Sequence, residues 1–481
     1  MNLKKSKKFN YMNITNNYNL LKFYLLLITC CFSQDIYTDF LIESGDTVDV
    51  FSYQIPENYN SNIEHPLLVA FHQWGGNENT NYYTEFDEQA NSRGWIMLSP
   101  YGGSSNNYNH QEAQRMVKQE IKWISENYNI DLNRIYMVGG SMGGASGAIY
   151  SNNHLNPTEP MIAATASASG ILDCERRAIE MNGNNSMIEW FGGNWDEVPF
   201  EYHRNSAIYF ADSTQSMHYN LKYLPIYLDF GVTEPHRSHA EELYNILIDY
   251  NPSIWIDTEP TGNHGYPVFD ENHVCNWLNQ FELNDNPIEI NVNLDEPSRA
   301  YWIEAKNQIE QNDFIRIIAN KNNEDQNESI IINQYTNSDS LILHILNENI
   351  EIFDLDLNSN ENIEAIGFTG TIINQLLSYN AYINSPTILG CSYYFNFDNN
   401  IFWLNSNNCE IGLEPYNINF EFILAEDINF DGIWNILDIV LLVGYIIDEE
   451  ILNETQQLNA DLNNDQIINV LDIVEILNII L

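Results

Sequence analysis

The pentapeptide 139–143, Gly-Gly-Ser-Met-Gly, constrains the fold more than any other part of this sequence. The apolar run 134–138 before it is typical of a buried strand, and the small residues 145–150 after it can begin a helix. A tight turn from strand to helix forces unusual backbone angles on the serine, and adjacent glycines leave room for the chain to fold back. The first N–H groups of the helix then point at the serine. In this setting the pattern Gly-x-Ser-x-Gly predicts that Ser141 is a nucleophile.

Short motifs recur by chance, so the alternative is a glycine-rich turn with an incidental serine. The two interpretations differ in what the rest of the chain must supply, because a nucleophilic serine needs a base, an acid and donors for an oxyanion.

Strands and helices are expected to alternate around this turn. The apolar run 66–71 is continuous, as a parallel strand buried on both faces requires. The segment 112–128 has helical periodicity, with Met116, Ile121 and Ile124 apolar. Such alternation predicts an α/β fold built on a parallel sheet. The remaining expected elements are strands at 47–56, 95–102, 163–169, 225–230 and 254–256, and helices at 239–250 and 271–281.

An acid and a base follow the serine in the order Ser, acid, His that this kind of sheet requires of a catalytic triad. His264 lies in a turn-forming loop after the last strand, and the alternative is a solvated loop histidine. Glu234 follows the strand 225–230 and can reach His264 from the end of the sheet. Asp229 lies within that strand, where its side chain points to a face of the sheet, and it stays as the second candidate for the acid.

These residues predict acyl transfer through a covalent intermediate. His264 accepts the proton of Ser141 as the hydroxyl attacks an ester carbonyl, and the acid orients and stabilises the imidazole. The tetrahedral oxyanion needs two backbone donors, for which we expect the N–H groups of Met142 and of Trp74 in the loop 72–76. Water then hydrolyses the acyl-enzyme.

Residues 44–283 resemble the secreted α/β-hydrolase esterases related to polyhydroxybutyrate depolymerases, feruloyl esterases and acetyl xylan esterases. The resemblance implies an α/β-hydrolase domain over 34–286 that hydrolyses carboxylic esters without a catalytic cofactor. Gln73 stands where the family usually has glycine, and Glu234 stands where aspartate is usual. The segments that carry the resemblance are Ile55-Pro56, His72–Gly76, Ile130–Tyr136 with the Gly-Gly-Ser-Met-Gly-Gly that follows, Gly231–Glu234 and Gly262–Gly265.

The segment 171–223 is a long insertion between two expected strands. One interpretation is a lid or a wall of the acyl pocket, and the other is a structured excursion that packs on its own aromatic side chains. Such side chains suit a feruloyl, a sugar or a polyester substrate alike, so the sequence does not select the ester. The aromatic residues are Trp190, Phe191, Trp195, Phe200 and Tyr202.

Residues 1–33 combine early lysines with the apolar run 23–32, which predicts a secretory signal peptide cleaved after Ser33. A start at Met12 and a lipoprotein signal are the alternatives. The run is too short to span a bilayer comfortably, so no transmembrane segment is expected. The 67 acidic residues against 19 basic ones give a formal charge of −48, which argues against nucleic acid and anionic membranes as partners.

Export places the remaining four cysteines in an oxidising compartment, where three pairings are possible. Proximity in the sequence favours Cys391–Cys409, which leaves Cys174–Cys275. No spacing among these cysteines is typical of a zinc site.

From about residue 287 the pattern changes to short alternating stretches between Asn- and Asp-rich turns, as at 289–293, 314–318 and 341–346. This pattern predicts a β-sandwich over 287–420, faintly similar to the immunoglobulin-like modules that follow such hydrolases. Residues 350–424 either complete this sandwich or form a second, cohesin-like one. We expect the region to be a spacer.

Residues 421–481 contain one acidic pattern twice, with the copies 34 residues apart. Oxygen ligands at loop positions one, three, five and twelve, with a backbone carbonyl at seven, fit Ca²⁺. A solvated acidic run is the alternative, but it does not explain why the whole pattern recurs. The expected ligands are Asp427, Asn429, Asp431, Ile433 and Asp438 in the first copy and Asp461, Asn463, Asp465, Ile467 and Asp472 in the second.

An apolar helix follows each loop, over 439–447 and 473–480, and aspartate rather than glutamate ends each loop. The duplicated loop and helix resemble a type I dockerin, which implies attachment to a cohesin-like scaffold or cell-surface protein. Gln466 replaces the turn glycine in the second loop, which implies a weaker second calcium site.

Together these segments predict a secreted serine esterase that acts on polysaccharide-linked feruloyl or acetyl esters, or on a hydroxyalkanoate polyester. The alternatives are a serine peptidase of the prolyl-oligopeptidase type, which uses the same triad, and a non-catalytic calcium-dependent binding protein.

Overall fold

The structure is a computed structural model. It describes residues 35–480 except 183–185, 325–326, 347–351, 358–362, 371–378, 384–391, 397–398, 400, 406–415, 425–427, 430–434, 448 and 464–466. The predicted signal peptide and the predicted Cys391–Cys409 pair lie outside the described residues. So do four of the predicted calcium ligands, namely Asp427, Asp431, Ile433 and Asp465.

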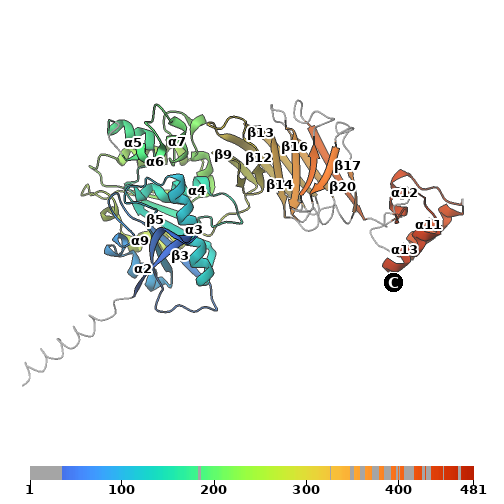
Figure 1. Cartoon of the computed structure of the whole chain (residues 1–481), viewed down its shortest axis with the longest axis horizontal. Coiled ribbons are helices and arrows are strands. Elements are labelled where there is room, and N and C mark those ends of the chain that lie inside the picture. Colours follow the sequence, from blue (N-terminus) through green and yellow to red (C-terminus); the bar gives the residue numbers. More distant parts are fainter. Residues whose placement is uncertain are drawn as a thin grey trace, which may run out of the picture.

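The N-terminal part of the chain is built on an eight-stranded sheet with the order β1-β2-β4-β3-β5-β6-β7-β8 (Figure 1). From β4 to β8 every neighbouring pair is parallel, whereas β1 and β2 pair antiparallel at one edge. This order is that of an α/β-hydrolase sheet, which confirms the predicted fold class. The strands are β1 Ile36–Glu43, β2 Asp46–Gln54, β3 His65–Phe71, β4 Ile96–Pro100, β5 Ile130–Gly140, β6 Ala164–Ala168, β7 Ile226–Asp229 and β8 Ile254–Ile256.

Helices cover both faces of this sheet, which explains why strands such as β3 are apolar without interruption. On one face Leu67 and Val69 pack in a core with residues of α3, α4 and α8. On the other face Leu68 and Ala70 pack with residues of α2 and α9. The helices are α2 Phe86–Arg93, α3 Gln111–Asn127, α4 Ser146–Asn153, α8 Arg237–Leu247 and α9 Glu271–Leu278.

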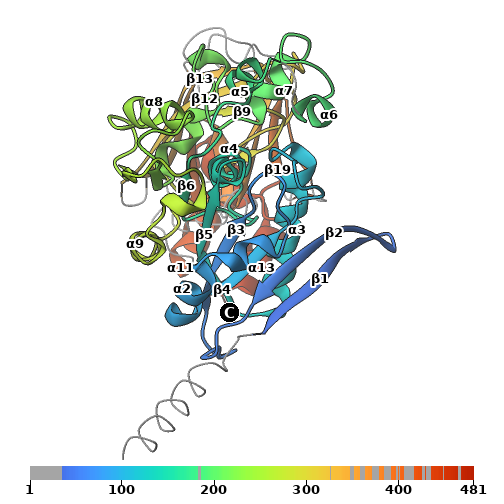
Figure 2. The ribbon, with the colours of Figure 1, turned by 90° about the vertical axis from the view of Figure 1, so that its left-hand side faces the viewer.

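The first strand expected from the sequence, 47–56, is the second strand of the sheet. It pairs with β1 in a hairpin, which Figure 2 shows extending beyond the body of the domain. Most of β1 is exposed, so it lacks the continuous apolar run by which the buried strands were predicted.

The insertion 171–223 folds into short helices over one end of the sheet. These are α5 Cys174–Glu180, α6 Met187–Phe191 and α7 Pro199–Arg204, followed by the 3₁₀ turns η3 Ser213–Gln215 and η4 His218–Tyr223.

The predicted Cys174–Cys275 disulfide is wrong, because both thiols are free and buried. Cys174 belongs to the core of the insertion, whereas Cys275 lies in α9 on a face of the sheet. Burial raises the pKa of each thiol to about 12, which keeps both protonated and unreactive.

The region after residue 287 is a sandwich of two six-stranded sheets. Their orders are β10-β11-β14-β16-β19-β18 and β17-β20-β15-β13-β12-β9, so strands from both halves of the region enter each sheet. The described strands therefore form one sandwich rather than two. They are β9 Glu289–Leu294, β10 Arg299–Ala300, β11 Ile303–Ala305, β12 Ile315–Glu324, β13 Asn327–Thr336, β14 Ser340–Ile345, β15 Ile352–Leu357, β16 Ala365–Gly370, β17 Tyr379–Ile383, β18 Ser392–Asn396, β19 Ile401–Asn405 and β20 Tyr416–Leu424.

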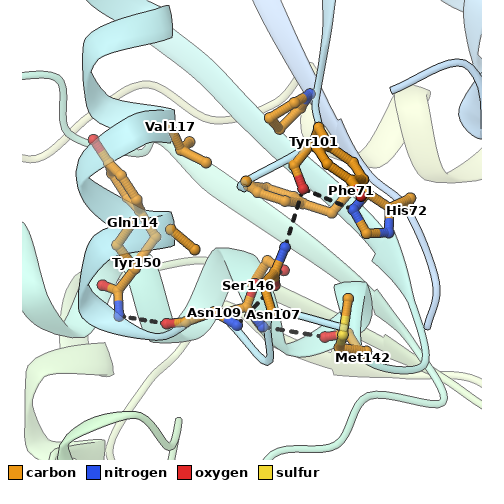
Figure 3. Close-up of a pocket in the computed structure, with 13 residues that line it drawn as sticks. Phe71, His72, Tyr101, Asn107, Asn109, Gln114, Val117, Met142, Ser146 and Tyr150 are labelled. Carbon is orange, nitrogen blue, oxygen red and sulfur yellow. Dashed lines mark hydrogen bonds between the residues drawn. The ribbon is translucent and has the colours of Figure 1, made fainter. Parts of the chain in front are cut away.

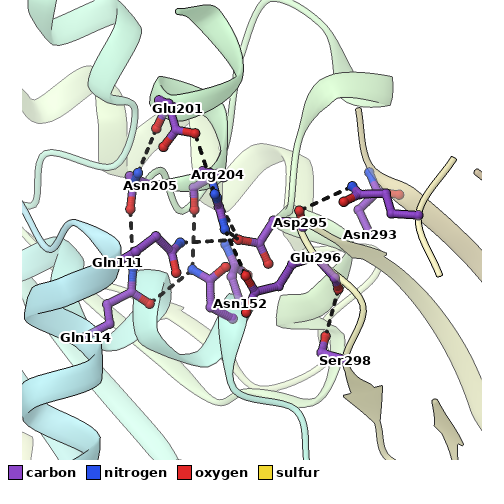
Figure 4. A network of polar contacts seen from close by, with 12 residues as sticks. Gln111, Gln114, Asn152, Glu201, Arg204, Asn205, Asn293, Asp295, Glu296 and Ser298 are labelled. Atoms are coloured by element: carbon purple, nitrogen blue, oxygen red, sulfur yellow. Dashed lines mark hydrogen bonds and ion pairs between the residues drawn. The ribbon is translucent and has the colours of Figure 1, made fainter. Parts of the chain in front are cut away.

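The sandwich is joined to the insertion by a buried polar network (Figure 4). Asp295 accepts from Arg204 Nε at 2.7 Å and from Gln111 Nε2 at 3.3 Å. Asn293 and Asn220 exchange two hydrogen bonds of 2.8 and 2.9 Å. The predicted spacer is thus in extensive contact with the α/β domain.

The C-terminal part contains α11 Ile436–Ile446, α12 Glu454–Ala460 and α13 Val470–Ile480. Helices α11 and α13 correspond to the two predicted helices and share one apolar core, whereas α12 between them was not expected. Among the described residues, no helix combines the length and apolarity needed to cross a membrane.

Candidate active site

Ser141 lies at the turn between β5 and the 3₁₀ turn η2 (Gly143–Ala145), with a φ of 56°. This left-handed conformation is uncommon for serine and is held by local bonds. The Ser141 N–H donates to Ala168 O at 2.8 Å, and its carbonyl accepts from Gly144 N–H at 3.0 Å. A Cβ at position 139 would lie 2.1 Å from the carbonyl oxygen of Gly143. Glycine at 139 is therefore required for the chain to turn back on itself.

The three residues expected to form a triad are in one hydrogen-bonded chain. His264 Nε2 lies 2.8 Å from Ser141 Oγ, and His264 Nδ1 lies 2.9 Å from Glu234 Oε2. The Glu234 side chain is 1% exposed, whereas that of His264 is 38% exposed. A buried carboxylate, an imidazole and a hydroxyl that is open to solvent are thus in the order that nucleophilic activation requires.

Asp229, the second candidate for the acid, lies at the end of β7, and its carboxylate contacts the backbone of the next residue rather than His264. Its Oδ1 accepts from the N–H of Phe230 at 2.8 Å. Burial raises the pKa of Asp229 to about 7, and the nearby Asp257 and Glu259 carboxylates add to this effect. Of the two candidates, Glu234 is the one whose carboxylate contacts His264.

The loop after β3 lies against the strand-to-helix turn at residues 139–143, which we call the elbow and where the predicted reaction needs oxyanion donors. A Cβ on Gly143 would be 2.6 Å from His72 O, so the two backbones are in close contact. Within the described part of the chain, no acceptor takes the N–H of Met142, Trp74 or Gln73. Gln73 N–H was not considered from the sequence. The Gln73 side chain lies against Gly265, beside His264.

The loop is fixed by His72, whose Nε2 lies 2.9 Å from Tyr101 O and whose Nδ1 lies 2.9 Å from Gln73 O. His72 therefore holds the loop rather than supplying a second base. The Trp74 side chain is 61% exposed.

Polar side chains contact the elbow beside a cavity of about 20 Å³ (Figure 3). This volume suits a single water molecule. Asn109 Nδ2 donates to Met142 O at 3.3 Å, and Gln114 Nε2 donates to Asn109 O at 2.8 Å. Sequence reasoning missed this support, although an asparagine-rich run at 106–109 was visible. Its Tyr108 and Asn109 both have positive φ.

The insertion packs directly on Met142, the residue that follows Ser141. Met142 belongs to one core with Tyr108, Phe191 and Tyr202. Trp190 stacks on His110 with ring centroids 4.6 Å apart and donates to Asn106 O at 3.0 Å. The aromatic residues of the insertion therefore pack both on one another and on the elbow.

Two buried carboxylates organise the C-terminal loops in the same way. Asp438 accepts the N–H groups of Asn429 at 3.1 Å and Asn435 at 2.9 Å. Asp472 accepts those of Asn463 at 3.3 Å and Asn469 at 2.8 Å. Both carboxylates are fully buried, and residues 421–481 contain no Lys, Arg or His. The donor set is thus all oxygen, and no side chain of this segment is cationic, which fits a divalent cation such as Ca²⁺. Asp461 and Ile467 are also described, at the start and at position seven of the second loop.

Comparisons with known proteins agree with this description. The family model of the dockerin type I domain matches residues 425–481, which confirms the predicted dockerin-like tail. A bifunctional acetylxylan esterase/xylanase from Neocallimastix patriciarum is 31% identical over 138 residues. That match covers 27% of this chain and 19% of the length of the relative, and it supports the predicted resemblance to acetyl xylan esterases.

Several solved structures resemble part of the chain. A fluorophosphonate-binding serine hydrolase from Staphylococcus aureus, FphF, has 13% identity and a TM-score of 0.38, and the likeness covers 51% of this chain and 98% of that one. A ferulic acid esterase has 15% identity and a TM-score of 0.39, with 51% and 97% covered. An esterase from Pyrobaculum calidifontis has 16% identity and a TM-score of 0.40, with 55% and 92% covered.

Proposed function

We propose that this protein is a serine esterase that hydrolyses carboxylic esters through Ser141, His264 and Glu234. The observation that carries the proposal is the continuous chain from the Ser141 hydroxyl through His264 to the buried Glu234 carboxylate, with contacts of 2.8 and 2.9 Å. The strained φ of Ser141 supports it, because such strain is characteristic of a nucleophile elbow.

In the proposed reaction, Ser141 Oγ attacks the carbonyl carbon of the ester while its proton passes to His264 Nε2. Glu234 stabilises the imidazolium that forms. The oxyanion accepts hydrogen bonds from Met142 N–H and from a second donor on the loop after β3, Trp74 or Gln73. One such donor is worth about 3 kcal/mol of transition-state stabilisation. When the intermediate collapses, the alcohol leaves with the proton of His264, and water then cleaves the acyl-enzyme by the same steps.

The substrate class we favour is an acetyl or feruloyl ester carried by a polysaccharide. The acetylxylan esterase activity named for the bifunctional Neocallimastix relative supports this choice. The purified full chain should release acetate from acetylated xylan or ferulate from a feruloylated arabinoxylan, and should leave a peptide anilide intact. Cleavage of the anilide with no ester hydrolysis would favour the peptidase alternative, and hydrolysis of poly-hydroxybutyrate alone would favour the polyester.

We further propose that the tail binds Ca²⁺ and then a cohesin-type module. Asn429, Asp438, Asp461, Asn463, Ile467 and Asp472 would hold the ions together with the ligands outside the described residues. The bound cation would fix the two loops relative to α11 and α13. Secretion through the signal in residues 1–33 is part of the same proposal, since a calcium-dependent anchor for a polysaccharide esterase suits the cell exterior.

A further inference from the structure

A carboxylate and two histidines form a cluster beside the proposed triad. Glu180 ends α5 in the insertion, whereas His236 and His239 lie at the start of α8. Glu180 Oε2 is 3.5 Å from His236 Nδ1, and Glu180 Oε1 is 4.0 Å from His239 Nε2. Among the described residues, both of these nitrogens are buried and neither has a hydrogen-bond partner.

The composition of this cluster is that of a metal site, but the protonation of His239 argues against one. His239 Nδ1 accepts the backbone N–H groups of Leu172 at 3.1 Å and Asp173 at 3.3 Å. A neutral imidazole that accepts at Nδ1 carries its proton on Nε2. Burial lowers the pKa of His239 to about 3, so the ring stays neutral. Its Nε2–H therefore points at Glu180 and offers no lone pair to a cation.

The cluster is connected to the triad through His236. The His236 backbone N–H donates to Glu234 Oε2 at 3.2 Å, which is the oxygen that also contacts His264. The His236 ring lies edge-on to the His264 ring, with centroids 5.6 Å apart and planes at 63°. The side chain of His236 is only 12% exposed. Any shift of the His236 ring would therefore change the packing around the imidazole of His264, the proposed base.

We propose that Glu180 is a positioning residue of the triad, through which the insertion holds His236 against His264. Its carboxylate faces His239 Nε2–H at 4.0 Å and His236 Nδ1 at 3.5 Å. At these separations the attraction is electrostatic, and it favours the Nδ1–H tautomer of His236 and the edge-on orientation of its ring. The proposal rests on the proposed esterase function, and it assigns to the insertion a role in catalysis beyond covering the site.

The charges around His236 set the sign of the expected effect. Arg177 and Glu180 face it from α5, and Glu234 and His264 face it from the proposed triad. His239 faces it from α8, with ring centroids 6.2 Å apart. A guanidinium nitrogen of Arg177 lies 3.2 Å from Glu180 Oε2, and Arg176 Nε lies 3.7 Å from Glu180 Oε1. Removing the Glu180 charge leaves Arg177 without this partner, whereas Arg176 keeps Glu242 at 3.0 Å. The lost negative charge disfavours an imidazolium nearby. The acidic limb of the kcat/KM profile, where activity requires a neutral base, should then move to lower pH.

The test compares Glu180→Gln, Glu180→Asp and Glu180→Ala in the full chain. In Glu180→Gln the midpoint of the acidic limb should fall by about 0.3–1 pH unit, and kcat should fall roughly threefold with KM unchanged. Glu180→Asp keeps the charge and should retain the wild-type midpoint. Glu180→Ala should lose about tenfold in kcat, because the ring of His236 is no longer held. Glu126→Gln, which removes an exposed carboxylate on α3, is the matched control.

NMR titration of the His264 imidazole in wild type and Glu180→Gln gives a readout that does not require turnover. A downward shift of its midpoint in the variant supports the proposal even if no ester is found to be hydrolysed, in which case only the esterase function fails. An unchanged midpoint in both measurements, or an equal effect of Glu126→Gln, overturns the role of Glu180. Zn²⁺ bound by wild type and lost in His239→Ala would also overturn it in favour of a metal site.

Discussion

Glu234 and Asp229 are close in sequence, yet their carboxylates have different hydrogen-bond partners. Glu234 contacts the imidazole of His264, whereas Asp229 faces its own backbone with a pKa raised to about 7. A triad acid must contact the imidazole that it stabilises, and of these two carboxylates it is Glu234 that does so.

The first prediction separates these carboxylates by activity. Glu234→Gln should lower kcat on p-nitrophenyl acetate by about 10³-fold or more, because the amide favours the wrong imidazole tautomer. Asp229→Asn, an equally small change at the end of β7, should stay within a few-fold of wild type. The reverse ranking would make Asp229 the acid.

The second prediction concerns stability and pH. The pKa of Asp229 is about 7 in the folded protein and about 4 in an unfolded chain. The folded state therefore keeps a proton that the unfolded state loses between these values. This contribution is fully present below pH 4 and is lost as the pH rises to about 7, at about 1.4 kcal/mol per pH unit at most. Urea denaturation should show that Asp229→Asn gains stability relative to wild type between pH 4.5 and 7.5, and a difference that does not change with pH would contradict this.

The residues proposed to carry out catalysis were predictable, because each one follows a strand that is recognisable from its apolar pattern. Ser141 and His264 stand next to glycines at strand ends, where the spacing is informative. Their supports were not predictable, because they depend on contacts between segments distant in sequence. These contacts join Asn109 to Met142, Gln114 to Asn205 and the ring of His236 to that of His264. The pairing of Cys174 with Cys275 failed for the same reason, since separation along the chain does not tell which layer a residue enters.

At the scale of elements, the elbow depends on close backbone contact. We expect Gly139→Ala to lower the free energy of unfolding by about 3 kcal/mol or more, because its Cβ would meet a carbonyl oxygen at 2.1 Å. Gly193→Ala is the control, since its Cβ would meet side chains rather than backbone, namely the end of Glu197 at 3.2 Å and the methyl groups of Val198 at 3.4 Å. Differential scanning calorimetry should show a much larger loss for the first variant, and equal losses would contradict the packing argument.

The duplicated loops give a prediction at the same scale. Titration of the metal-free full chain with Ca²⁺ should show two sites in wild type. It should show one in Asp438→Asn and one in Asp472→Asn, because each buried carboxylate organises its own loop. The exposed Glu449 lies outside both loops, and Glu449→Gln should keep two sites. Identical titrations of all four proteins would show that calcium does not bind here.

Strands buried on both faces were predicted because they are continuously apolar. Helices buried on one face were predicted because their apolar residues recur with helical periodicity. The exposed β1 and the short α12 leave no such pattern, and both were missed. Whether one or two sandwiches follow the first domain depends on which strands pair, for instance β13 with β15 in parallel. Such long-range pairing is not encoded in local alternation.

For the whole molecule, the contact between the insertion and the sandwich leads to a prediction about the free energy of unfolding. Arg204 is 15% exposed and pairs with Asp295, which is 6% exposed, and with Glu296, which is 65% exposed. Asp295→Ala removes the buried partner of the Arg204 guanidinium, which keeps only the more exposed Glu201 and Glu296 at 3.5 Å, and should destabilise the chain by about 3 kcal/mol. Glu296→Ala should cost under about 1 kcal/mol. Thermal unfolding of the two variants checks this, and similar Tm values would contradict a buried junction.

The proposed function depends most directly on Ser141 as a nucleophile. Incubating the full chain with a fluorophosphonate and digesting it for mass spectrometry tests this in one step. We predict a single phosphonylated peptide with the modification on Ser141, and no labelling of Ser141→Ala or of protein in which His264 is replaced by alanine. Unlabelled wild-type protein, or a label on another residue, would contradict the proposal that this elbow carries out catalysis.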